Sequence, residues 1–159
     1  MTRIEDVIPG TARGKVGIIV GPRYRSPAAF ALETALEVVN ADAGAAMCIL
    51  YSLPPYPEPE AQGLVVLSRS LPRNIALYVE RKILEKDWLS FSFVIIERAW
   101  QRKEDEAQVL KNLTRVAVRF NVAIAVMPLP HDFLLEMLPT RDELVIAGLV
   151  GVGCVMLVR

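Results

Sequence analysis

Hydrophobic positions along the chain follow two patterns that alternate with each other. Short apolar runs rich in valine and isoleucine predict buried strands, and longer stretches with apolar residues at every third or fourth position predict amphipathic helices. The strands are expected at residues 15–20, 46–52, 63–68, 91–97 and 122–127. The helices are expected at residues 27–40, from Ser70 and Pro72 to about 86, and from about 104 to 120. This alternation predicts an α/β fold in which a mainly parallel β-sheet is flanked by helices on both faces.

Two further stretches stand outside this alternation. Residues 54–59 hold four prolines, which remove backbone donors and fix φ, so we expect a stiff polyproline-like connector there. A docking segment for an aromatic-lined groove is the alternative. Residues 144–158 are apolar but are broken by Gly148, Gly151 and Gly153, and they predict one or two further strands at the sheet edge.

Composition and charge indicate one domain with a large core. The chain has 159 residues, 53% of them hydrophobic, which fits a sheet buried on both faces and favours association with a second copy or a partner protein. Its 18 basic and 18 acidic residues cancel, so any binding to nucleic acid must come from a local patch. Residues 1–14 carry charges and no apolar core, and no apolar run is long enough to cross a membrane. We therefore expect a cytoplasmic protein with no signal peptide and no membrane contact.

The two cysteines are expected to be buried free thiols. Cys48 and Cys154 each lie in an apolar, strand-like run, and neither has a histidine or a second cysteine at the spacing of a metal site.

The loop after the first predicted strand carries the most informative chemistry. Residues 21–28 read Gly-Pro-Arg-Tyr-Arg-Ser-Pro-Ala, with the first glycine and the spacing of the phosphate-binding loop G-x-x-x-x-G-K-[ST]. Ser26, Pro27 and Ala28 occupy the last three positions, where ATPases place the lysine that reaches the phosphates and the hydroxyl that holds Mg²⁺. Proline and alanine supply neither group, whereas Ser26 suits an N-cap and Pro27 a first helical residue. We expect no ATP hydrolysis, no enzymatic activity and no cofactor.

Two further segments, taken with this loop, carry a resemblance to a known family. Residues 94–97 read Val-Ile-Ile-Glu, and residues 110–126 read Leu-Lys-Asn-Leu-Thr-Arg-Val-Ala-Val-Arg-Phe-Asn-Val-Ala-Ile-Ala-Val. With these segments the chain resembles the RecA-like ATPase core of archaeal RadA and RadB recombinases from Gly14 to its end. The resemblance implies a single RecA-like domain over residues 1–159, with a P-loop-type fold and an N-terminal segment over residues 1–14.

The positions that carry ATP chemistry in this family are altered here. The resemblance places Glu97 where relatives orient Mg²⁺ with an aspartate. Residues 52–55 stand where relatives place a water-activating glutamate, and residues 127–129 stand where they sense the γ-phosphate. These positions read Ser-Leu-Pro-Pro and Met-Pro-Leu, so hydrolysis by the family's mechanism is not expected.

A vestigial phosphate site is nevertheless a candidate, because a helix N-terminus with nearby guanidinium groups still binds anions. Its residues are Gly21, Arg23, Arg25, Ser26 and Glu97. The alternative is that both arginines are solvated or paired with acidic neighbours, and that Glu97 forms an ion pair with Arg98 or Arg25.

The loop after the fourth predicted strand is the candidate DNA-binding site. Arg98, Arg102 and Lys103 surround Trp100, and cations around an aromatic ring suit single-stranded DNA, since they bind phosphates while the indole stacks on a base. In the recombinases the corresponding region contributes to contact with single-stranded DNA. The alternative is a solvated helix start with Trp100 packed beneath it, because residues 104–106 are acidic and weaken the local positive potential.

These features lead to three hypotheses about function. The first is a non-catalytic RecA-like paralogue that assists or regulates DNA recombination or repair by binding DNA, a recombinase or both. The expected partners are then a second copy of the chain or a RecA-family protein, and single-stranded DNA. The second is a protein-binding module similar to KaiC-like signalling proteins, with no DNA or ATP activity. The third is an enzyme with different chemistry at the strand ends, for which Glu97, Arg23, Arg25 and His131 are the only candidates and form no known constellation.

Overall fold

The computed structural model describes residues 13–20, 26–40, 44–51, 62–68, 70–127, 144–150 and 153–158. Its centre is a sheet with five parallel strands, namely β1 (Val16–Val20), β2 (Ala45–Leu50), β3 (Leu64–Ser68), β4 (Phe91–Ile96) and β5 (Ala123–Val126). Two more strands, β6 (Leu144–Val150) and β7 (Gly153–Val158), form an antiparallel hairpin, and β7 pairs antiparallel with β1. The strand order is β3-β2-β4-β5-β1-β7-β6.

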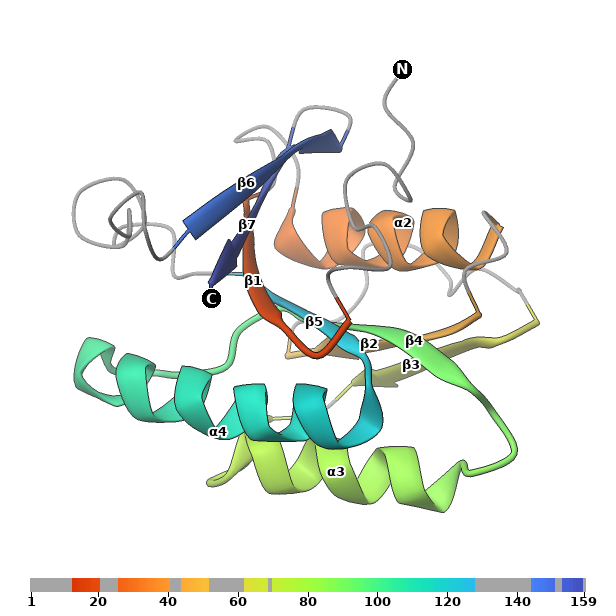
Figure 1. Cartoon of the computed structure of the whole chain (residues 1–159), viewed down its shortest axis with the longest axis horizontal. Coiled ribbons are helices and arrows are strands. Elements are labelled where there is room, and N and C mark those ends of the chain that lie inside the picture. The colour runs from red at the N-terminus through yellow and green to blue at the C-terminus, as the bar shows by residue number, and fades with distance from the viewer. Residues whose placement is uncertain are drawn as a thin grey trace.

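Helices cover both faces of this sheet (Figure 1). One face carries α2 (Pro27–Asn40), and the other carries α3 (Ile75–Glu85) and α4 (Glu106–Phe120), with the short 3₁₀ helix η2 (Lys103–Asp105) just before α4. The α/β class, the mainly parallel sheet and the helices on both faces are thereby confirmed. The apolar stretch 144–158 does form strands at the sheet edge, as its glycine-broken pattern predicts.

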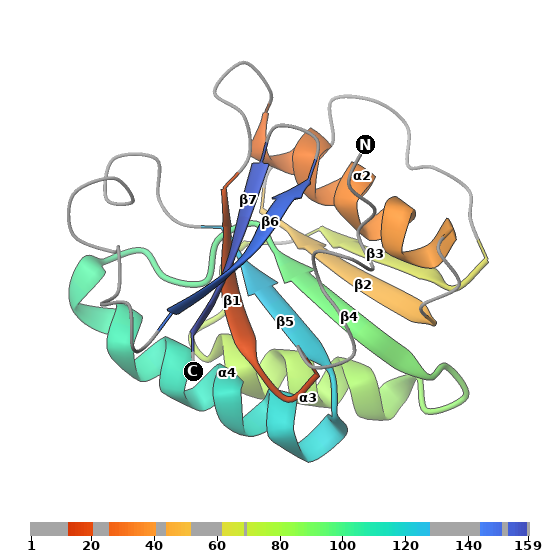
Figure 2. The same ribbon diagram turned by 45° about the horizontal axis from the view of Figure 1, so that its top comes forward.

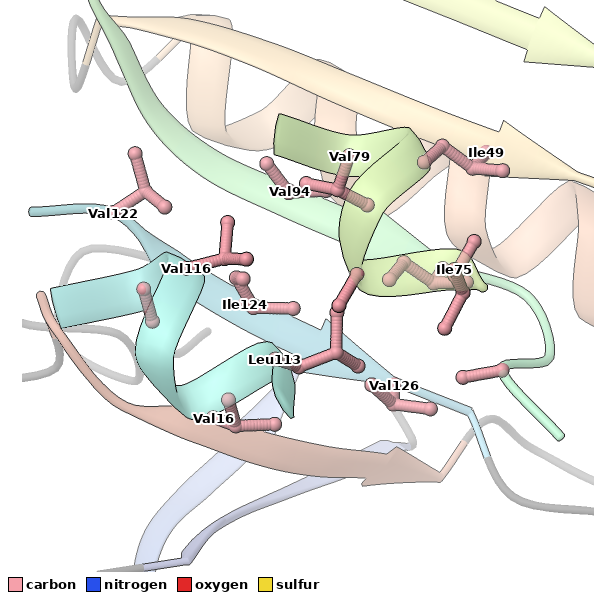
Figure 3. Close-up of a cluster of buried hydrophobic side chains, with 14 of the residues drawn as sticks. Val16, Ile49, Ile75, Val79, Val94, Leu113, Val116, Val122, Ile124 and Val126 are labelled. Carbon is pink, nitrogen blue, oxygen red and sulfur yellow. The ribbon is translucent and has the colours of Figure 1, made fainter. Parts of the chain in front are cut away.

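Two apolar cores result from this layering. Along β4, Phe93 and Ile95 face α2, whereas Val94 and Ile96 face α3 and α4, because successive side chains of a strand point to opposite faces. Figure 3 shows the core between the sheet and the α3–α4 layer, where Leu113 of α4 points toward the strands. Cys48 is a buried free thiol, as predicted; the side chain of Cys154 lies outside the described part.

The start of α3 differs from the prediction. Ser70 and Pro72 are the sequence signals for a helix start, yet the helix begins at Ile75 with Asn74 as its N-cap. Asn74 has an extended backbone, and its side-chain Oδ1 accepts a hydrogen bond of 3.1 Å from the Leu77 N–H. The Asn74 side chain thus provides an acceptor for a backbone N–H of the first turn that has no partner within the helix. The helix therefore begins after Asn74, later in the chain than Pro72 suggests.

Among the helices in the described part of the chain, none combines the length and the apolar character that a membrane crossing requires.

Candidate functional site

The N-cap and first turn of α2 contain residues 26–28, the last three positions of the phosphate-loop pattern. Ser26 Oγ accepts a hydrogen bond of 3.1 Å from the Ala29 N–H, so this residue is the N-cap of α2. Pro27 is the first helical residue, and Ala28 is buried in the core beneath the helix. The positions that would need a lysine and a metal-binding hydroxyl therefore hold a proline and a buried methyl group. Gly21, Arg23 and Arg25, the other loop candidates, lie outside the described residues.

Glu97 connects two strand ends. It directly follows β4 and is buried, and its Oε2 accepts a hydrogen bond of 2.7 Å from the backbone N–H of Tyr51, which directly follows β2. The Glu97 N–H in turn donates to the Ile49 carbonyl at 2.9 Å. The sequence suggests an ion pair between Glu97 and Arg98 or Arg25. It does not predict this hydrogen bond from Glu97 to the backbone of the neighbouring strand. Arg98, one of the two expected partners, has an exposed side chain.

These two strand ends also mark a change of direction in the fold. β2 and β4 are neighbours, but the chain continues from β2 to β3 on one side and from β4 to β5 on the other. In open α/β sheets such a point, at the carboxyl ends of the strands, is where ligands bind. Glu97 lies at this point, and one of its oxygens is already engaged by the Tyr51 amide.

Trp100 does not present a stacking surface. Only 2% of its surface is exposed, and it packs in the core between the sheet and the α3–α4 layer, together with Ala99. The predicted stacking of a base on Trp100 is therefore wrong for this conformation, and the alternative, Trp100 packed beneath the helix start, is correct. The burial of so large an apolar side chain stabilises the loop more than an exposed indole would.

The three cations of this loop are exposed. Arg98, Arg102 and Lys103 all face solvent, and Arg102 Nε lies 3.5 Å from the Asp105 carboxylate. The predicted cationic residues are therefore accessible, but one of them has an acidic neighbour, as the acidic start of the helix suggests.

A groove of about 710 Å³ opens beside this loop, between the N-terminal ends of α3 and α4. It is lined by residues from two segments that are far apart in the sequence, 71–76 and 99–112, which follow β3 and β4. Figure 2 shows the two helices side by side below the sheet. Arg73 lines the groove from the first segment, and Arg102 and Asp105 line it from the second. The lining itself therefore has one more basic than acidic residue, although Glu104 and Glu106 lie beside it at the start of α4. The partial charge of the backbone at a helix N-terminus is also positive.

Arg73 was not among the predicted site residues, nor were the side-chain amides that line the groove with it, those of Asn74, Gln108 and Asn112. A signal was present, because the carboxyl ends of parallel strands share one edge of the sheet, so the segments that follow β3 and β4 must meet there. Within the described residues, no cluster of histidine, cysteine and acidic side chains is arranged to hold a metal ion. Chemically, the groove offers donors for an anionic ligand.

A comparison with protein-family models finds no match, and a comparison with curated proteins finds none either.

Proposed function

We propose that this protein is a non-catalytic RecA-like paralogue that assists or regulates DNA recombination or repair by binding DNA, a recombinase or both. The observation that carries the proposal is the groove at the carboxyl edge of the sheet, with Arg73 and Arg102 in its lining. The order of a strand, a phosphate-loop-like segment and a helix, with Pro27 and the buried Ala28 at the helix start, supports the non-catalytic part.

The groove favours the phosphates of a single strand over its bases. A guanidinium group donates two parallel hydrogen bonds to a phosphate, and the two arginines come from separate segments of the groove lining. Trp100 is buried, so base stacking contributes nothing in this conformation. Binding of this kind is independent of sequence and depends strongly on salt, because it releases counterions from the nucleic acid.

The experiment is fluorescence anisotropy of a labelled oligothymidine and a labelled duplex, titrated with the protein at low and at physiological salt. The test variant is Arg73→Gln with Arg102→Gln, and the control is Lys111→Gln with Arg115→Gln, which removes two exposed cations of α4 that do not line the groove. For a single strand, each lost phosphate contact reduces the magnitude of the negative slope of log K against log salt by roughly 0.7. The test pair should therefore reduce this magnitude by roughly 1.4. The control pair should leave it almost unchanged.

Three outcomes each contradict a part of the proposal. If the unaltered protein binds no oligonucleotide at low salt, the DNA part fails. If both pairs of substitutions weaken binding equally, the cations act only through overall charge, and the groove is not the site. ATP turnover by the unaltered protein would contradict the non-catalytic part.

A second candidate function is favoured by a different observation. Large apolar side chains on and just after α3 are exposed to solvent, among them Leu84 and Trp88. Exposed apolar groups of this kind suit a protein-binding module similar to KaiC-like signalling proteins, with no DNA or ATP activity. Binding to a protein partner without any salt-sensitive binding to DNA would favour this function.

A further inference from the structure

β3 is an edge of the sheet, and among the described strands only β2 pairs with it. The strand order ends at β3, and Figure 2 shows β3 at the border of the sheet, beyond β2. Edge strands invite pairing with other chains, and natural proteins usually protect them with charges, prolines or bulges. β3 reads Leu-Val-Val-Leu-Ser, with no charge and no proline, and its pairing with β2 has no shift of register. The strand itself therefore carries none of these protective devices.

The register with β2 determines which backbone groups of β3 point outward. The Ala46 N–H donates a hydrogen bond of 2.9 Å to the Gly63 carbonyl just before β3. In a parallel pair every second residue directs both its N–H and its C=O to the same neighbouring strand, so Val65 and Leu67 direct theirs to β2. The groups that point away from β2 belong to the residues between and after them: Leu64, Val66 and Ser68.

The side chains of β3 are only partly covered. β2 is buried along its whole length, whereas four residues of β3 are half-buried: Leu64, Val65, Val66 and Leu67. Leu64 and Val66 lie on the α2 side of the sheet, and Val65 and Leu67 lie on the α3–α4 side. A further strand beside β3 would cover apolar side chains on both faces and would supply partners for the outward backbone groups.

β3 is complementary to a second copy of β3 that runs antiparallel to it. With a two-fold axis at Val66, this residue lies opposite its own copy, and Leu64 lies opposite the partner's Ser68. Every outward N–H then meets an outward C=O of the other copy, because the three outward residues are spaced symmetrically about Val66. Val65 lies opposite the partner's Leu67, so the residues between them form apolar pairs. A two-fold interface requires a surface that is complementary to itself, and this edge provides one.

We propose that two copies of this chain associate through β3, as an antiparallel β3–β3 pair with Val66 on the two-fold axis. The occupant of the edge is a second copy and not the chain's own connector, because four of the six residues 54–59 are prolines, which have no N–H to donate. The association is independent of the proposed function, since the groove is built from the segments that follow β3 and β4. One strand pair buries less area than a typical stable interface, so we expect a dissociation constant in the micromolar range or weaker.

Two measurements on the unaltered full chain test the proposal without a substitution. Sedimentation velocity over a series from about 1 to several hundred µM should show a shift from monomer to dimer. Hydrogen exchange followed by mass spectrometry should show protection of residues 64–68 that rises over the same series, because the Leu64 and Val66 amides gain acceptors in the dimer. Residues 91–96 of β4 are the internal control, since they pair with strands on both sides and should not change.

Three results of these measurements overturn the proposal. The first is a protein that stays monomeric throughout the series. The second is a monomer in which residues 64–68 are protected at every concentration, because the chain's own residues then cover the edge. The third is a dimer in which the protection of residues 64–68 does not rise, because the copies then associate elsewhere.

Charges placed at Val66 test the register, because only a residue on the two-fold axis meets its own copy. Val66→Lys and Val66→Glu should each raise the dissociation constant roughly tenfold or more, since each loses an apolar pair and sets like charges opposite each other. An equimolar mixture of the two variants should associate again, because lysine then lies opposite glutamate.

The matched controls are Val118→Lys and Val118→Glu, which place the same charges at an exposed apolar residue of α4. Each control should dimerise as the unaltered protein does. Circular dichroism checks that every variant is folded, and hydrogen exchange on the unaltered protein decides the matter if the Val66 variants are not. A dimer that neither Val66 substitution weakens overturns the proposal. Folded Val66 variants that do not associate when mixed overturn the register.

Discussion

The Glu97 carboxylate accepts a hydrogen bond of 2.7 Å from the backbone N–H of Tyr51, and so joins the end of β4 to the end of β2. The bond crosses the point at which the chain leaves these neighbouring strands in opposite directions. A side chain thus continues the pairing of the two strands beyond their last backbone contacts.

Replacing Glu97 separates the role of its hydrogen bond from that of its charge. Glu97→Ala leaves the Tyr51 N–H without its acceptor and should lower the free energy of unfolding by about 1–3 kcal/mol. Glu97→Gln keeps a carbonyl oxygen at the same reach and should cost about half as much or less. Urea denaturation measures both. Equal stability of Glu97→Ala and the unaltered protein would show that the bond contributes nothing.

Trp100 is expected to act in the core and not on DNA. Trp100→Ala should lower the free energy of unfolding by about 3–5 kcal/mol, because it leaves a cavity beneath the start of α4. Trp100→Phe retains most of the apolar volume and removes a buried Nε1 that has no hydrogen-bond partner among the described residues, so it should cost about 1.5 kcal/mol or less. Oligonucleotide affinity of the Phe variant should equal that of the unaltered protein. A large loss of affinity in a stable Phe variant would restore the stacking role.

Asn74 both caps α3 and lines the groove, and two substitutions distinguish these roles. Asn74→Ala removes the cap and should lower the free energy of unfolding by about 1 kcal/mol. Asn74→Asp keeps the cap but adds a negative charge to the groove, so it should preserve stability and weaken oligonucleotide binding. Thermal unfolding and anisotropy, measured on both variants, check the two effects. If the Asp variant bound DNA as tightly as the unaltered protein, phosphates would not lie near Asn74.

Gly44 is expected to tolerate no side chain. It has a φ of +102°, and a Cβ there would lie 3.0 Å from the Ser90 carbonyl oxygen, where the chain enters β2. Gly44→Ala should therefore cost about 2–4 kcal/mol, the sum of backbone strain and displacement of Ser90. Gly14→Ala is the control, since its φ is also positive at +79° but the nearest atom is 3.9 Å away. Its cost should be about 1 kcal/mol. Equal costs in denaturant unfolding would show that the contact with Ser90 is unimportant.

Most of the fold follows from the periodicity of apolar residues, because strands buried on both faces and helices buried on one leave distinct patterns. The start of α3 was misplaced because Ser70, Pro72 and Asn74 are all acceptable starts, and only the geometry of the cap selects among them. For a similar reason the sequence could not choose between the two alternatives for Trp100, stacking on DNA and packing beneath the helix start. Its neighbours in the sequence are charged, whereas its packing partners come from other elements of the core.

The groove required more than local pattern. Arg102 could be predicted because it lies in a segment with several cations. Arg73 could not be predicted from its own segment, because it joins the site only when the segments that follow β3 and β4 meet at one edge of the sheet. Candidate sites built from a single segment are therefore accessible to sequence reasoning, while those built across strands depend on the strand order.

The position of β1 bears on how the chain folds. Val16 pairs with Ile124 of β5 on one side and with Val158 of β7 on the other, so both neighbours of β1 are synthesised more than 100 residues later. During translation β1 leaves the ribosome long before either neighbour exists, so its backbone N–H and C=O groups stay unpaired and its apolar side chains stay exposed until then. Contacts of such long sequence separation slow folding and expose strands to aggregation. The sheet can close around β1 only after residues 153–158 have been synthesised, and until then chaperone protection of the nascent chain would matter most for residues 16–20.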